Sequence, residues 1–108
     1  MTQTRTVTTY RAQIFIAGNI DQAKQVCREF CMSGLCVTVT PTTFIYTGGE
    51  EAGIVVGLIN YPRFPADPTD ILEKAEQLAN LLRAKLCQHS FSIVADDTTI
   101  WSTHRVAQ

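Results

Sequence analysis

The sequence predicts an α+β domain of the ferredoxin-like type, in which a βαββαβ chain forms an antiparallel sheet with two helices on one face. Three observations lead to this prediction. The chain has 108 residues, the size of one domain, and 45% of them are hydrophobic, enough for one packed core. Segments of alternating apolar and polar residues, typical of half-buried strands, are interrupted by two segments of helical periodicity. These segments follow the order strand, helix, strand, strand, helix, strand.

The first strand and the first helix are predicted before residue 35. Residues 10–16 alternate between apolar and polar side chains, as a strand with one buried face does. Asn19 is a favourable N-cap, and Gln22 stands three residues later in the capping-box position. Gly34 is expected to end the helix. The apolar stripe of this helix consists of Ile20, Ala23, Val26, Cys27 and Phe30.

The middle of the chain predicts a hairpin and a stiff loop. A second strand covers about residues 35–46, and Pro41 within it requires an edge strand or a bulge. Residues 47–51 are predicted to form a solvated turn. Residues 54–60 are apolar on both faces, as in a central strand buried on both sides. Residues 61–65 contain two prolines and predict a stiff extended loop.

The last part predicts a long helix and a C-terminal hairpin. Asp67 is expected to cap the helix and Pro68 to occupy its first position. A strand follows at 90–95, a turn at 96–98 and a short additional strand at 99–103. We expect residues 1–9 to form a flexible lead-in and residues 10–108 a single domain. The stripe of the long helix consists of Ile71, Ala75, Leu78, Leu82 and Leu86.

Composition excludes several classes of partner. Nine basic and ten acidic residues leave a formal net charge of −1, which supplies no attraction to nucleic acid or to an anionic membrane. The longest apolar stretch, residues 54–59, falls far short of the roughly 20 residues that span a bilayer. The polar beginning of the chain does not resemble a signal peptide, so we expect a cytoplasmic location.

The predicted topology sorts the candidate binding residues to two ends of the sheet. One end collects the hairpin with Tyr46 and Glu50, together with Gln88 and His89, and could hold a small polar ligand. Alternatively, the glycines and the cap at this end only shape the fold. The other end collects the 61–64 loop.

The 61–64 loop places a guanidinium between two aromatic rings. Arginine and aromatic residues are enriched at binding hot spots, and a stiff loop loses little entropy on docking. Arg63, between Tyr61 and Phe64, could also clamp a nucleotide through phosphate pairing and base stacking. In the structural alternative the two rings close the core and Arg63 is solvated.

The four cysteines predict neither a metal site nor disulfides. Their spacing does not match the usual zinc ligand spacing, and we interpret them as reduced thiols that pack as small apolar groups. No cofactor is predicted. A small enzyme using Glu50, His89 or Cys87 is retained as an alternative function. The cysteines are Cys27, Cys31, Cys36 and Cys87.

The third strand predicts self-association. Val55, Gly57 and Ile59 lie on one of its faces, and only one face of the sheet can meet the helices. An apolar face left open usually marks an interface. We therefore expect a homodimer or higher oligomer formed through this sheet face.

The chain also resembles small uncharacterised proteins of tailed phages and prophages. The resemblance lies in residues 48–65, Gln88-His89-Ser90 and Thr99-Ile100-Trp101, and it covers most of the chain from Tyr10 onward. It implies an accessory phage protein that acts in the host cytoplasm. Such proteins are often non-enzymatic and bind a host defence protein or sequester a nucleotide signal.

The prediction for function is therefore a non-enzymatic, homo-oligomeric binding module without a catalytic residue. Its partner would be a small polar ligand or nucleotide signal, and in the alternative a host defence protein. The predicted ligand-binding residues are Tyr61, Arg63, Phe64, Tyr46, Glu50, Gln88 and His89.

Overall fold

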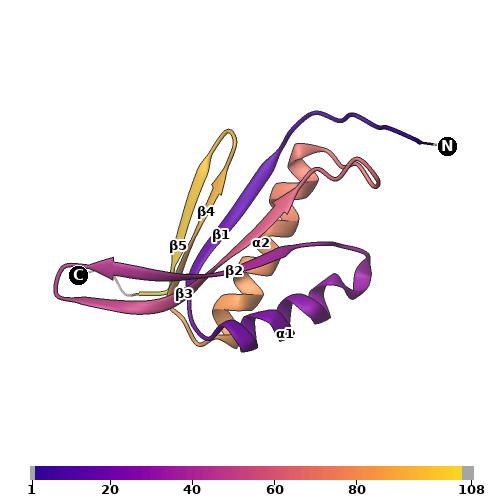
Figure 1. Cartoon of the computed structure of the whole chain (residues 1–108). Helices are drawn as coiled ribbons and strands as arrows, with labels where there is room; N and C mark the ends of the chain where they lie inside the picture. Colours follow the sequence, from indigo (N-terminus) through magenta and orange to yellow (C-terminus); the bar gives the residue numbers. More distant parts are fainter. Residues whose placement is uncertain (1, 106–108) are drawn as a thin grey trace.

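A five-stranded sheet with helices packed on one face forms the fold (Figure 1). The structure is a computed structural model that describes residues 2–105. Its elements are β1 (Arg11–Ala17), α1 (Ile20–Phe30), a 3₁₀ turn (Cys31–Ser33), β2 (Thr38–Tyr46), β3 (Gly49–Ile59), α2 (Pro68–Lys85), β4 (Ser90–Ala95) and β5 (Thr99–Thr103). The strands lie in the order β2-β3-β1-β4-β5, and all neighbours are antiparallel. This confirms the predicted ferredoxin-like fold, with the C-terminal hairpin adding the fifth strand.

The core lies between the helices and one face of the sheet. Every second residue is buried there from Ala12 to Ile16 of β1 and from Ile54 to Leu58 of β3, as the two-residue period of a strand requires. The five predicted stripe residues of α2 are buried against the same face. The buried strand residues are Ala12, Ile14, Ile16, Ile54, Val56 and Leu58.

The helix ends follow the predicted capping residues with two differences. The Asn19 side chain accepts a hydrogen bond from the Gln22 backbone N–H at 3.0 Å, which confirms the cap of α1. Gly34 adopts the left-handed conformation with φ of 104°, but a 3₁₀ turn stands between it and α1. Asp67 precedes α2 as expected, yet its side chain makes no capping hydrogen bond, and Pro68 is the first helical residue.

The hairpin of β2 and β3 is longer than predicted. The interpretation of residues 47–51 as a turn is wrong, because β3 already begins at Gly49 and pairs with Tyr46. The central strand β1 ends at Ala17, opposite Gly53, so residues 43–52 extend beyond it. We call residues 43–52 the arm, which projects to the left in Figure 1. The residues of the arm are mostly exposed, so the sequence there lacks the alternation of apolar and polar residues that predicts a strand.

The face of the sheet away from the helices, which we call the open face, is only partly covered. The prediction that β3 is buried on both sides is wrong, because the Ile59 side chain remains 44% exposed. Val55 and Gly57, on the same face, are half-buried. As Pro41 requires, β2 is an edge strand.

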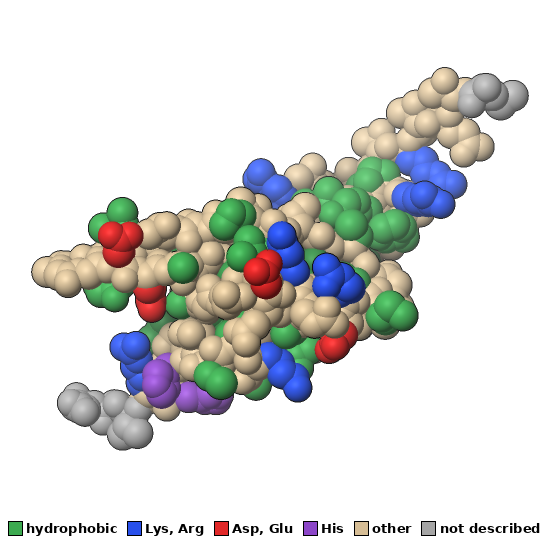
Figure 2. Space-filling model, turned by 60° about the horizontal axis from the view of Figure 1, so that its bottom comes forward, with side chains coloured by type: hydrophobic (Ala, Val, Ile, Leu, Met, Phe, Trp, Pro, Cys, Tyr) green, Lys and Arg blue, Asp and Glu red, His purple; other side chains and the backbone are tan. Residues whose placement is uncertain are grey.

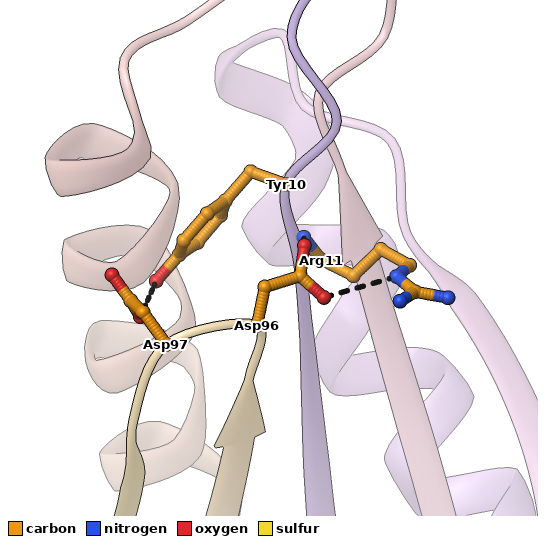
Figure 3. Close-up of polar contacts among 4 residues, drawn as sticks. All are labelled: Tyr10, Arg11, Asp96 and Asp97. Carbon is orange, nitrogen blue, oxygen red and sulfur yellow. Dashed lines mark hydrogen bonds and ion pairs between the residues drawn. The ribbon is translucent and has the colours of Figure 1, made fainter.

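Polar contacts join the start of β1 to the turn between β4 and β5 (Figure 3). The Tyr10 hydroxyl donates to an Asp97 carboxylate oxygen at 3.1 Å. Burial, followed by this hydrogen bond, raises the pKa of Tyr10. Asp96 accepts from the Arg11 backbone N–H at 2.9 Å and from its Nε at 3.1 Å. These contacts tie the first residues of β1 to the β4–β5 turn, next to the backbone pairing of β1 with β4.

The structure assigns neither helix nor strand to residues 2–10. A flexible lead-in and a single domain stay predictions, and the predicted end at residue 108 lies outside the described residues. Neither helix within residues 2–105 has the length and apolarity needed to cross a membrane.

Candidate functional site

A pocket of about 200 Å³ lies where β1 ends and β4 begins, next to the base of the arm. We call it the arm pocket. It draws on every strand of the sheet and on the turn after α2. The lining residues are Phe15, Ile16, Ala17, Phe44, Glu51, Gln88, His89, Ser90, Phe91, Ser92, Trp101 and Arg105.

Aromatic rings form much of the wall of the arm pocket. Phe15 of β1 and Phe44 of β2 lie on the open face, and Trp101 of β5 joins them there at 66% exposure. The ring of Phe44 rests directly on Gly53, where no Cβ keeps it away from the sheet. Flat rings of this kind can stack on a heteroaromatic ligand.

Both signs of charge border the arm pocket. Glu51 reaches it from the arm, and Arg105 from the chain after β5. Figure 2 shows acidic side chains on the arm, at the left, and histidine and basic side chains below it. The pocket can therefore meet a ligand that carries both a cation and an anion.

The turn after α2 brings Gln88 and His89 to the pocket. Cys87 adopts φ of 56°, and the Gln88 backbone N–H donates to the Arg83 carbonyl at 2.9 Å. This is the Schellman ending of a helix, with cysteine where glycine is usual. The His89 carbonyl in turn accepts from the His104 N–H at 2.7 Å, which ties the turn to the end of β5.

The predicted residues at this end of the sheet are only partly brought together. Gln88 and His89 line the arm pocket, whereas Glu50 pairs with Ile45 and Tyr46 with Gly49 near the arm tip. Adjacent residues of a strand point to opposite faces, so Glu51 and not Glu50 is on the pocket side. The alternative enzyme residues Glu50 and Cys87 do not line the pocket.

The 61–64 loop lies at the other end of β3, next to a separate apolar pocket of about 190 Å³. Tyr61 and Phe64 line this pocket with ring centres 5.4 Å apart. A hydrogen bond with the Cys36 thiol, followed by burial, raises the pKa of Tyr61 to about 12. Arg63 is exposed, and its carbonyl accepts from Arg5 at 3.4 Å. The seven predicted residues therefore occupy two regions, and their role in binding stays a prediction.

Sequence reasoning missed several lining residues of the arm pocket. The sequence predicts a solvated turn at Glu51, and nothing in it distinguishes Phe15 and Phe44 from other strand residues. Trp101 had one signal, since it is the only tryptophan and stands on an exposed strand. Within residues 2–105, no three His, Cys, Asp or Glu side chains are grouped to hold a metal ion.

No family model matches the chain, and no curated protein matches it in sequence. Solved structures do share its fold. The apo form of a phage SAM lyase superposes with a TM-score of 0.74 at 17% identity and covers 92% of each chain. A phage SAM lyase in complex with S-methyl-5′-thioadenosine gives 0.77 at 15% identity and covers 100% of this chain and 99% of the other.

A more distant likeness is to CutA from Synechococcus elongatus. It has a TM-score of 0.52 and 16% identity, and covers 90% of this chain and 82% of that chain. At these identities the three likenesses establish the fold.

These comparisons correct the predicted function. Two of these structures are phage SAM lyases that share the fold over 92% and 100% of the chain, and they contradict the prediction of a non-enzymatic binding module. The prediction that the chain is not an enzyme is wrong for the same reason. The expectation of a small ligand is consistent with the comparison, because one of these lyases is in complex with S-methyl-5′-thioadenosine.

Proposed function

We propose that this chain is an enzyme that cleaves S-adenosylmethionine and releases S-methyl-5′-thioadenosine in the arm pocket. One observation carries the proposal: the fold of a phage SAM lyase in complex with S-methyl-5′-thioadenosine extends over 100% of the chain at a TM-score of 0.77. The chemistry of the arm pocket supports it independently.

The three parts of S-adenosylmethionine match three kinds of group in the arm pocket. Its adenine ring can stack on Trp101 or on the phenylalanine rings of the wall. Its sulfonium is a cation, which the Glu51 carboxylate and the ring faces attract. Its methionine carboxylate can pair with the guanidinium of Arg105.

The proposed reaction balances without water or an added reagent. The carboxylate oxygen of the substrate attacks its own γ-carbon, and the bond from that carbon to sulfur breaks. The electron pair of that bond stays on sulfur, so neutral S-methyl-5′-thioadenosine leaves and the remaining four-carbon unit closes as a lactone. No proton is transferred. The protein has to fold the methionine chain so that the oxygen meets the carbon in line with the departing sulfur.

This reaction assigns Glu51 to substrate binding. The positive charge on sulfur disappears as the bond breaks, so a carboxylate beside it stabilises the bound substrate more than the transition state. Glu51 should therefore discriminate the cationic substrate from the neutral product.

The test measures S-methyl-5′-thioadenosine by mass spectrometry after incubating purified protein with S-adenosylmethionine. We expect formation well above the spontaneous rate in buffer. For Glu51→Gln we expect about a tenfold rise in KM, equivalent to roughly 1.4 kcal/mol. Because the lost contact favours the bound substrate over the transition state, kcat should be equal to or higher than that of wild type, and the affinity for S-methyl-5′-thioadenosine should be nearly unchanged. Glu50→Gln, which removes the neighbouring charge from the other side of the arm, is the matched control and should behave as wild type.

Two outcomes would contradict this proposal. Product formation no faster than in buffer would reject the activity. A Glu51→Gln variant that loses kcat while KM is unchanged would reject the binding role and point to proton abstraction by this carboxylate.

Self-association through the open face belongs to the same proposal. The arm pocket opens on this face, where Trp101 of its wall is 66% exposed. Toward the other end of the same face, Ile59 and Val94 remain 44% and 40% exposed. A second copy packed there would exclude water from the site and strengthen its electrostatic contacts. The phage origin and the host cytoplasm as the place of action, which the sequence resemblance implies, complete the proposal.

A further inference from the structure

Arg83 is a charged side chain buried inside the described part of the chain. It lies near the end of α2, on the helix side of the sheet, and is 5% exposed. Burying a guanidinium costs several kcal/mol unless its charge and its N–H groups find partners.

The partners of Arg83 are neutral. One terminal nitrogen donates to Ser102 Oγ and the other to Asn80 Oδ1, both at 2.7 Å. The guanidinium carbon lies 4.7 Å from the centre of the Phe91 ring. Within residues 2–105, no carboxylate forms an ion pair with Arg83. Without a partner charge, only two neutral hydrogen bonds and one ring contact offset the cost of burying this guanidinium, so packing alone is a weak reason for an arginine here.

The contacts of Arg83 join the two strands of the C-terminal hairpin. Ser102 belongs to β5, and Phe91, directly opposite it, belongs to β4. β5 is an edge strand, and β4 is its one neighbour within the described sheet. Phe91 and Trp101, the residue before Ser102, both line the arm pocket.

We propose that Arg83 is a positioning residue of the arm pocket, which holds Trp101 and Phe91 in place through Ser102 and the Phe91 ring. The proposal rests on the proposed function, because it assigns Arg83 to the binding of the same adenosyl ligand. Arg83 does not line the pocket and acts through the residues that do.

The test compares Arg83→Met with Lys85→Met, which removes the same charge from an exposed position of the same helix. Trp101 is the only tryptophan, so its fluorescence reports β5 without labelling. We expect Arg83→Met to unfold near the wild-type urea concentration. Its Trp101 fluorescence anisotropy should be lower than in wild type, because β5 is held less firmly. Its binding of S-methyl-5′-thioadenosine should be about tenfold weaker. Lys85→Met should match wild type in all three measurements.

Ser102→Ala is the second variant, and it decides the case if Arg83→Met does not fold. It removes the contact to β5, and it should reproduce the loss of anisotropy and affinity. Wild-type anisotropy and affinity in the variants would overturn the proposal. If the wild-type protein binds no S-methyl-5′-thioadenosine, the proposed function fails, and the anisotropy in the free protein still decides whether Arg83 holds β5.

Discussion

Cys27 illustrates at the scale of one residue how burial changes the chemistry of a side chain. It is 3% exposed on the core side of α1. Burial, followed by the nearby Cys31, raises the pKa of the Cys27 thiol to about 11. At neutral pH it is therefore a protonated, small apolar group, as the apolar stripe of the helix predicts.

This pKa predicts how stability changes with pH. The thiol ionises near its ordinary value of 9.0 in the unfolded chain and near 11 in the folded chain, so the unfolded state loses its proton first as pH rises. Folding should thus lose about 2 kcal/mol of stability between these pH values. Urea unfolding from pH 8 to 11 should show this extra loss for wild type and not for Cys27→Ala.

Cys87→Ala is the control for this measurement, because it removes an exposed thiol. It should keep the wild-type slope of stability against pH. Parallel curves for wild type and Cys27→Ala would show that the Cys27 thiol ionises alike in the folded and unfolded states.

At the scale of an element, the arm shows how a glycine permits a close contact between neighbouring strands. Gly53 stands where the arm joins the sheet, and the Phe44 ring occupies the space that a side chain would need. A Cβ at this position would also come within 2.9 Å of the Ile16 carbonyl oxygen. That backbone atom cannot move without disturbing the centre of the sheet.

Gly53→Ala should therefore lower the free energy of unfolding by about 2 kcal/mol, because overpacking forces both the ring and the backbone to move. Gly57→Ala, on the same face of the same strand, is the matched control. There the new Cβ meets only the Thr38 side chain, at 2.5 Å from Oγ1, and a hydroxyl can rotate away. We expect a cost below about 1 kcal/mol for the control, measured by urea unfolding. Equal costs would contradict this account of the arm.

At the scale of the whole molecule, the two faces of the sheet differ in how far they are covered. Helices cover one side of the sheet, while Ile59, Val94 and Trp101 remain exposed on the other. The described molecule is also elongated, with extents of 56 × 28 × 23 Å. A second copy on the open face would bury these side chains and the mouth of the arm pocket together.

The double variant Ile59→Lys/Val94→Lys should therefore reduce the mass in solution to that of the monomer, because burying charges at such an interface is costly. Sedimentation equilibrium measures the mass, and circular dichroism checks that the variant remains folded. Met32→Lys is the control, since Met32 is 84% exposed on the 3₁₀ turn away from the sheet. A monomeric wild type, or a double variant with wild-type mass, would reject self-association through this face.

Local patterns in the sequence were sufficient for most of the fold. These patterns are the alternation in β1, the Asn19 cap and the stripe of α2. Each is recognised from the spacing between residues that are close in the sequence. Their order along the chain was enough to predict the ferredoxin-like topology. The arm escaped this reasoning because backbone pairing, and not apolar alternation, forms it.

The candidate site depended on information that local patterns do not contain. The sequence by itself determined that Gln88 and His89 lie at the end of the sheet where the β2–β3 hairpin turns. Only the tertiary structure decided that Glu51 and Trp101 join them there. The physical reason is register: successive residues of a strand face opposite sides, so a shift of one position would exchange Glu51 for Glu50. In the arm this register depends on β3 beginning at Gly49 and pairing with β2, which the mostly exposed residues of this segment do not reveal in the sequence.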